Sequence, residues 1–374
     1  MVLKGMTWDH SRGYASLEAA SHEFQEISGT TINWHRRSLQ AFADEPIEQI
    51  AKDYDLIVLD HPHVGLIAET GCLHALPVPD NPEQVSIGGS LESYFWNGRQ
   101  WALPIDAACQ VAVQRKDLCE ALPATWEDLV SQDFKKLNIV TPLLPVDAFD
   151  MLMTLVAGIG ETHLPFSEYE FISSRSGKKA LSIQKALYKR GPQEAINWNP
   201  ITTLEVMSTT DEFTYSPCLF GYINYAHPGF RDHQLTYTDL PLFAGVSRRC
   251  GILGGAGIGV SSHSQYLEEA VKFATWVASE PVQSDVYIKN EGQPAHRQTW
   301  EKLGNDPDYA GFLANTWDTM STAWTRPRDP WFLAYVDDVC AVYPDFFLKD
   351  LDPATFLATL NKLYRHHTQS RAIA

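Results

Sequence analysis

The spacing of hydrophobic residues near the amino terminus alternates between strand and helix patterns. The run Leu3–Trp8 predicts a strand, and apolar residues three or four positions apart after Tyr14 predict a helix that ends at Ser28-Gly29. Thr31–Trp34 resumes β character, and the apolar run Asp55–Asp60 is typical of a strand buried on both faces of a parallel sheet. This alternation predicts a doubly wound α/β lobe, in which ligands bind beyond the carboxyl ends of the strands.

Later segments continue the α/β pattern. Thr125 is a predicted helix N-cap with Asp128 at the third helical position, and Asn138–Pro142 is predicted as a short strand that runs into a loop. The segment 149–191 is predicted to be largely helical, and Gly251–Ser262 is predicted as a glycine-rich strand. The chain has 374 residues, more than one hydrophobic core usually serves, and no linker divides it. We therefore expect two lobes with more than one chain crossing.

The net charge and the cysteines limit the possible partners of the protein and its possible cellular compartment. The formal net charge is -17, from 29 basic and 46 acidic residues, which argues against nucleic acids and anionic membranes as partners. No apolar run approaches the roughly 18 residues that span a bilayer. Met1–Gly5 does not begin a secretory signal, so either an export signal was removed or the protein stays in the cytoplasm. The six scattered cysteines lack zinc-site spacing and fit a reducing compartment.

Four stretches of the sequence share a pattern with a known family. In chain order they are Thr7–Tyr14; Asp55–Leu59 with Gly71–Leu76; Phe95–Asp106 with Arg115–Leu118 and Thr125–Leu129; and Gly254–Ser261. Together they resemble the extracellular solute-binding family of ABC importers, which includes maltose-binding and other sugar-binding proteins. The third stretch is the most specific, since it resembles the motifs that the family writes G-x-x-Y-x-x-P, Y-x-K-D-L and P-x-T-W-E-E-L.

The resemblance implies an α/β fold with two doubly wound lobes joined by a hinge with multiple chain crossings, the type II arrangement of periplasmic binding proteins. The first lobe would comprise residues 1–107 plus 251–300, and the second residues 108–250 plus 301–374. A small polar solute would bind in the cleft between them and drive hinge closure. ABC permease subunits would be the partners of a monomer that needs no cofactor.

The residues after the first predicted strand are candidates for solute binding. His10 and Arg12 lie in the predicted loop, beside the further candidates Trp8 and Asp9. The guanidinium of Arg12 offers a planar fork of donors that suits vicinal hydroxyls or a carboxylate. The alternative for Arg12 is a structural ion pair with Asp9 or another neighbour.

The polar segment after the third predicted strand allows several roles. Asp60, His61 and His63 flank Pro62, which favours an extended segment with both rings on the same side. Hydrogen bonding to a solute, metal ligation with His10 as the third ligand, and loop capping are the alternatives. Asp106 is a further candidate because a carboxylate accepts two hydroxyl hydrogen bonds; its alternative is a helix or turn cap.

Candidates in the rest of the chain are mostly aromatic. Tyr222 can cover the apolar side of a sugar ring while Asn224 binds a hydroxyl, and Trp331 occupies a position where the family tends to carry a stacking aromatic. Core packing is the alternative for both aromatic residues. Gly255 belongs to a glycine run that lacks the P-loop and dinucleotide-binding patterns, so a backbone crossing between lobes, with amide groups near the solute, explains it better.

These observations favour a binding protein for a sugar, polyol or sugar acid that closes on its solute without chemistry. The rival is a cytoplasmic enzyme on the same two-lobed fold, with Asp60, His61, His63 and Asp106 as acid–base groups or metal ligands. The absence of a visible export signal and the free thiols favour the rival, whereas the absence of a recognisable catalytic signature counts against it. Localisation is accordingly periplasmic or cytoplasmic.

Overall fold

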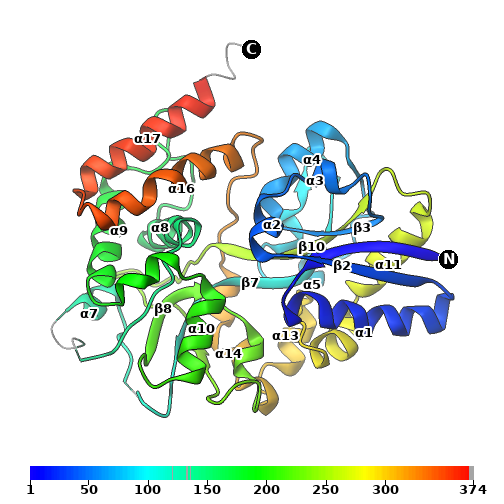
Figure 1. The fold of residues 1–374 in the computed structure, drawn as a ribbon, viewed down its shortest axis with the longest axis horizontal. Helices are drawn as coiled ribbons and strands as arrows, with labels where there is room; N and C mark the ends of the chain where they lie inside the picture. Colours follow the sequence, from blue (N-terminus) through cyan, green and yellow to red (C-terminus); the bar gives the residue numbers. More distant parts are fainter. Residues whose placement is uncertain (120, 132–133, 135, 370–374) are drawn as a thin grey trace. The chain divides into compact units, whose positions relative to one another are not determined.

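The computed structural model describes residues 1–119, 121–131, 134 and 136–369, and the chain divides into two compact units (Figure 1). Unit 1 comprises Met1–Ala108, Leu253–Asn305 and Arg328–Pro330. Unit 2 comprises Cys109–Ile252, Asp306–Pro327 and Trp331–Ala374. The chain therefore passes from one unit to the other more than once, and neither unit is a continuous segment.

Unit 1 is built on a mixed sheet with the strand order β2-β1-β3-β10, followed by the beginning of β7. Strand β1 is parallel to β2 and β3, whereas β10 is antiparallel to β3. In chain order the elements are β1 (Val2–Trp8), α1 (Ser11–Ser28), β2 (Thr31–Arg37), α2 (Leu39–Asp44), α3 (Ile47–Ile50), β3 (Leu56–Leu59), η1 (His61–His63), α4 (Val64–Thr70), β4 (Leu73–His74), α5 (Pro82–Val85), α6 (Ser90–Ser93), β5 (Phe95–Trp96), β6 (Arg99–Gln100), β7 (Leu103–Gln114), β10 (Leu253–Ser261), α11 (Leu267–Val277), α12 (Glu280–Val282), η4 (Gln283–Tyr287) and α13 (Arg297–Leu303).

Strand β3 is buried on both faces, as its apolar run predicts. Leu56 and Val58 enter a core shared with α1 and α11, whereas Ile57 and Leu59 enter a core shared with α3 and α4. This alternation follows from the two-residue period of a strand. Figure 1 shows α1 on one side of β1 and β3, and α3 and α4 on the other. The polar residues that follow β3 consequently lie at the edge of the sheet.

Unit 2 combines a small antiparallel sheet with a group of packed helices. The end of β7 pairs with β8 on one side and with β9 on the other, and helices α8, α9, α16 and α17 pack against one another. Its elements are α7 (Trp126–Val130), α8 (Pro145–Ile159), α9 (Ser174–Tyr188), η2 (Gln193–Asn197), α10 (Pro200–Thr209), β8 (Tyr215–Phe220), η3 (Ile223–Ala226), β9 (Thr236–Thr238), η5 (Pro307–Tyr309), α14 (Phe312–Asn315), α15 (Trp317–Ser321), α16 (Phe332–Leu348) and α17 (Pro353–Gln369).

Two local predictions in unit 2 have different outcomes. The Thr125 hydroxyl accepts a hydrogen bond from the amide of Asp128, whose carboxylate accepts one from the amide of Thr125, so the predicted cap of α7 is confirmed. The strand predicted at Asn138–Pro142 is wrong, because only an isolated bridge joins Ile139 to Tyr215. An apolar run alone cannot show whether a neighbouring strand offers it a continuous ladder of hydrogen bonds.

Two buried acidic residues in the first turns of α8 predict a stability that depends on pH. Burial, and then the nearby charge of Asp150, raise the pKa of Asp147 well above 3.8. A raised pKa in the folded state means that the native carboxyl group holds its proton more tightly than the unfolded one. Stability is therefore lost as the pH rises from about 3.8 towards neutrality.

The substitution Asp147→Asn is expected to stabilise the protein by about 1 kcal/mol at neutral pH and to flatten this decline, since the amide does not ionise. Urea denaturation across the acidic to neutral range measures both effects. Asp352→Asn, at an exposed helix cap near the carboxyl terminus, is the control. An unchanged pH profile in Asp147→Asn contradicts the assignment.

Within the described residues, no helix has the length and the apolar character needed to cross a membrane. All six cysteines are free thiols, four of them buried. Burial raises the pKa of the Cys72, Cys109 and Cys218 thiols, so these groups pack as small apolar residues.

Candidate functional site

Polar side chains gather at one edge of the unit 1 sheet. Strand β10 is antiparallel to β3 and pairs Gly257 with Leu59, so the beginning of β10 lies beyond the carboxyl end of β3. Asp60 follows β3 directly, and its charge contributes to the raised pKa of Asp106 on β7. Arg12, from the first turn of α1, contacts Asp106 at the same edge. The fold thus brings together three residues that the sequence singled out separately.

Arg12 and Asp106 form a buried ion pair. The Arg12 Nε atom donates to Asp106 Oδ2 at 2.7 Å, and Nη2 contacts the other carboxylate oxygen. Only 4% of Arg12 and 2% of Asp106 is exposed. Burial raises the pKa of Asp106, and the guanidinium opposes that shift. Each charge is therefore tolerated inside unit 1 because the other compensates for it.

Glutamine side chains fix the position of Asp106. Gln293 Nε2 donates to the carbonyl of Ala107 at 2.7 Å, and Gln283 Nε2 donates to the carbonyl of Ile105 at 2.9 Å. The Gln283 carbonyl in turn accepts a hydrogen bond from the amide of Ala295 at 2.7 Å. These bonds hold both backbone neighbours of Asp106. The sequence offered no signal for them, because both glutamines lie far from β7 along the chain.

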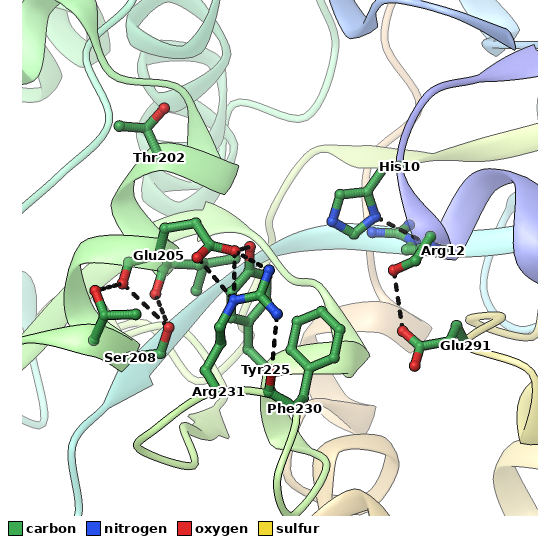
Figure 2. A network of polar contacts seen from close by, with 12 residues as sticks. His10, Arg12, Thr202, Glu205, Ser208, Tyr225, Phe230, Arg231 and Glu291 are labelled. Carbon is green, nitrogen blue, oxygen red and sulfur yellow. Dashed lines mark hydrogen bonds and ion pairs between the residues drawn. The ribbon is translucent and has the colours of Figure 1, made fainter.

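His10 caps the helix that carries Arg12, so the loop predicted for this segment is wrong. Helix α1 begins at Ser11, and His10 Nδ1 accepts a hydrogen bond from the amide of Arg12 at 3.1 Å (Figure 2). The hydroxyl of Ser11 donates to Glu291 at 3.0 Å. Asp9 is exposed and lies 3.9 Å from Arg36. Histidine is an uncommon N-cap, and for this reason the pattern did not mark the helix start.

The capping role of His10 yields a stability prediction. The substitution His10→Ala is expected to lower the free energy of unfolding by about 1 kcal/mol, because an amide in the first turn of α1 loses its acceptor. His10→Asn is the matched variant, since the asparagine carbonyl can accept the same hydrogen bond. Chemical denaturation measures both. Equal losses in the two variants would assign the effect to lost packing instead of capping.

Trp8, the last residue of β1, packs inside unit 1. Only 4% of the residue is exposed, and its ring lies 5.2 Å from that of Phe42. A Cβ atom at Gly13 would lie 2.4 Å from the Trp8 ring, so the first turn of α1 closes directly over the indole. The Trp8 ring therefore packs against the first turn of α1.

The segment after β3 is not extended. Residues His61–His63 form a 3₁₀ turn, and the Asp60 carboxylate caps it by accepting a hydrogen bond from the amide of His61 at 2.7 Å. The predicted strand-like alternation of the two rings is therefore wrong, because proline is also well suited to the first turn of a helix. His61 Nδ1 lies 3.0 Å from Asp60 Oδ1, and both histidines are buried.

Among the described residues, no three histidine, cysteine, aspartate or glutamate side chains form a cluster that could hold a metal ion. The predicted third ligand, His10, instead caps α1. Asp60 and His61 contact each other, so this part of the edge is a polar, partly exposed surface.

Gly255 allows β10 to lie against the backbone next to Asp106. Its φ is +95°, and a Cβ atom there would lie 2.3 Å from the carbonyl oxygen of Asp106. Gly257 and Gly259 of the same strand make room for the side chains of Tyr94 and Leu73. Close packing thus accounts for the glycine run, whereas the expected contact of its amide groups with a solute stays a prediction.

Two of the predicted residues of unit 2, Tyr222 and Asn224, lie beside and in the short turn η3. Tyr222 is 6% exposed, its backbone carbonyl accepts a hydrogen bond from the Tyr237 hydroxyl at 2.8 Å, and Asn224 is fully buried. Two charged residues that the sequence did not indicate lie beside this turn. Glu205 accepts hydrogen bonds from Arg231 Nε at 2.8 and 2.9 Å and from the Tyr225 hydroxyl at 2.6 Å (Figure 2).

Trp331 immediately precedes α16 and belongs to an aromatic cluster of unit 2. Its ring lies 5.4 Å from that of Tyr364, 6.0 Å from that of Tyr335 and 6.4 Å from that of Phe171. The core alternative therefore accounts for these ring contacts.

The fold was compared with those of known proteins. No family model matches the chain. The chain is similar to an ABC transporter solute-binding protein of Thermotoga lettingae TMO bound to α-D-tagatose, at 17% identity and a TM-score of 0.81, over 98% of this chain and 99% of that one. Maltose-bound MalE3 of T. maritima has 16% identity and a TM-score of 0.81, over 98% and 99% of the two chains. A solute-binding protein of Agrobacterium radiobacter K84 in complex with ribitol has 18% identity and a TM-score of 0.78, over 98% of each chain. The predicted fold class is confirmed: the chain has the two-lobed α/β fold of type II periplasmic binding proteins, shared with solute-binding proteins of ABC transporters.

Proposed function

We propose that this protein is the solute-binding component of an ABC importer and that its solute is a sugar, a polyol or a sugar acid. The observation that carries the proposal is the match over nearly the whole chain to solute-binding proteins that hold tagatose, maltose and ribitol. All three molecules are small and rich in hydroxyl groups. Such a role places the protein outside the cytoplasmic membrane, with permease subunits as its partners.

The polar edge of unit 1 suits a hydroxylated solute. The Asp60 side chain is 21% exposed, so a solute at this edge can reach the carboxylate that caps the 3₁₀ turn. Carboxylates accept strong hydrogen bonds from hydroxyl groups. Asp106 acts differently, because both of its oxygens contact Arg12. It therefore shapes the edge and fixes Arg12, and it does not offer the free acid–base group that the enzyme alternative requires.

In unit 2, the turn η3 and its neighbours are the proposed contacts. Tyr222 supplies an aromatic surface, and the Glu205–Arg231 pair supplies charged hydrogen-bonding groups beside it, whereas the fully buried Asn224 does not offer its amide to a solute. Aromatic faces with a few fixed polar groups are typical of sugar sites.

A thermal-shift screen tests the proposed function. D-tagatose, maltose, ribitol and D-gluconate are the probes, and a bound solute at 100 times its Kd is expected to stabilise the protein by about 2.7 kcal/mol. The shift with solute should shrink in Asp60→Ala and persist in Asp53→Ala, an exposed acidic residue of the same unit. Each variant is compared with itself without solute, so its basal stability does not enter. If no hydroxylated compound raises the melting temperature, the proposed function is wrong.

A further inference from the structure

Unit 2 contains a polar pocket of about 560 Å³ whose lining includes none of the solute-binding candidates Tyr222, Asn224 and Trp331. It is lined by the end of β7, by β8 and β9, by the segments that follow β7 and β9, and by the end of α14. Its volume falls within the range of roughly 300–1,000 Å³ that is typical of small-molecule sites.

A row of polar side chains crosses the three strands at this pocket. Gln114 on β7 pairs with Thr236 on β9 and with Tyr215 on β8, and all three residues line the pocket. Directly paired residues of antiparallel strands project from the same face of a sheet. Thr238 lies two residues beyond Thr236 and therefore joins the same face. The register of the sheet thus builds a continuous hydrogen-bonding surface.

Gln114 carries the evidence for a ligand. It is 8% exposed, and within the described part of the chain its side-chain carbonyl oxygen has no hydrogen-bond partner. A buried polar group without a partner costs about 1–3 kcal/mol. Native structures rarely leave such a group without a protein partner, an ordered water or a bound ligand. A hydroxyl group is a suitable partner, because it can donate to the Gln114 carbonyl and accept from its amide nitrogen.

The charges around the pocket favour an anionic ligand. Lys116 and Arg249 both line it, and no acidic side chain of the described residues lies within ion-pair distance of Lys116. Arg249 is only 3.9 Å from Asp318 and donates from Nε to the carbonyl of Leu240. Asp239, the single acid among the described lining residues, already accepts two hydrogen bonds from Thr319. Lys116 thus remains available to a carboxylate, and Arg249, which already contacts Asp318 and interacts electrostatically with Asp239, adds a partly compensated positive charge.

We propose that this pocket is a second ligand site, which binds a small polyhydroxylated carboxylate such as a sugar acid. Its hydroxyl groups bind Gln114 and Thr236, and its carboxylate binds Lys116 and Arg249. The site belongs to unit 2 alone, so it does not depend on the proposed transport function.

Titration of the isotope-labelled protein with D-gluconate tests the proposal by NMR. Gluconate is expected to shift the amide resonances of Thr236 and Thr238 saturably, and D-sorbitol, which has the hydroxyl groups but no carboxylate, is expected to bind these positions about tenfold more weakly. Both Gln114→Leu and Lys116→Gln should weaken gluconate binding about tenfold. The matched controls, Gln193→Leu and Lys178→Gln, are exposed positions of unit 2 and should leave binding unchanged.

The NMR results distinguish this pocket from the polar edge of unit 1 at Asp60. Shifts confined to amides near Asp60 and His61 would overturn the second site while supporting the first. Equal binding of sorbitol and gluconate at Thr236 would overturn the assignment of a carboxylate ligand. Unaltered gluconate binding in a folded Gln114→Leu variant would overturn the site itself.

Discussion

Replacing Asp106 with alanine is expected to lower the free energy of unfolding by about 3–5 kcal/mol. The substitution leaves the guanidinium of Arg12, only 4% exposed, without its charged partner inside unit 1. The free-energy cost of leaving the guanidinium charge buried without a partner exceeds that of the lost hydrogen bonds, because the transfer of a charge from water into the protein interior is unfavourable. Urea denaturation followed by circular dichroism measures the loss.

Two comparisons sharpen the Asp106 experiment. The double variant Arg12→Met/Asp106→Leu removes both charges and is expected to be markedly more stable than Asp106→Ala alone. Glu301→Ala breaks the exposed pair between Arg297 and Glu301 and is expected to cost only about 0.5 kcal/mol. A loss below about 1 kcal/mol in Asp106→Ala would show that the pair is not desolvated in solution.

Replacing Gly255 with alanine is expected to destabilise the protein by about 3 kcal/mol, because an unfavourable backbone conformation and a steric clash both contribute. The residue has a φ of +95°, which side chains rarely adopt, and the added Cβ would lie 2.3 Å from the carbonyl oxygen of Asp106. Relief of that contact requires β10 or β7 to shift, and this displaces Asp106 from Arg12. We therefore expect the variant to lose both stability and its thermal response to solute.

Gly71→Ala separates the two penalties. Gly71 has a φ of +64°, but an added Cβ atom would meet nothing within 4 Å, so alanine there experiences only the backbone preference. Its cost is expected to be about 1 kcal/mol. Comparable losses at Gly255 and Gly71 would contradict the close approach of β10 to β7.

The sequence predicted the regular elements of unit 1 well, because their signals are local. The apolar run at β3 specified a strand buried on both faces, and Ser28-Gly29 marked the end of α1. The first residue of a helix and the backbone conformation after a strand were harder to predict. Histidine at the start of α1 and proline within the turn after β3 each fit more than one backbone conformation, and packing made the choice.

The sequence identified candidate residues more readily than it indicated the role of each one. Arg12 and Asp106 were each expected to bind solute, with capping or an ion pair as alternatives, but their separation along the chain hid that they contact each other. Gln283, Gln293 and Gln114 carried no signal at all, because an isolated glutamine indicates nothing until its burial and its partners are known.

By itself, the sequence determined the class of the protein and the period of its elements: an acidic α/β chain with polar residues where its strands end. Such features follow from hydrophobic periodicity and turn chemistry, which act between residues close in the chain. The tertiary structure alone decided which charges are paired, which glycine must lack a side chain, and which buried glutamine carbonyl lacks a partner among the described residues. These properties depend on desolvation and contact between residues far apart in sequence, so only the folded chain can establish them.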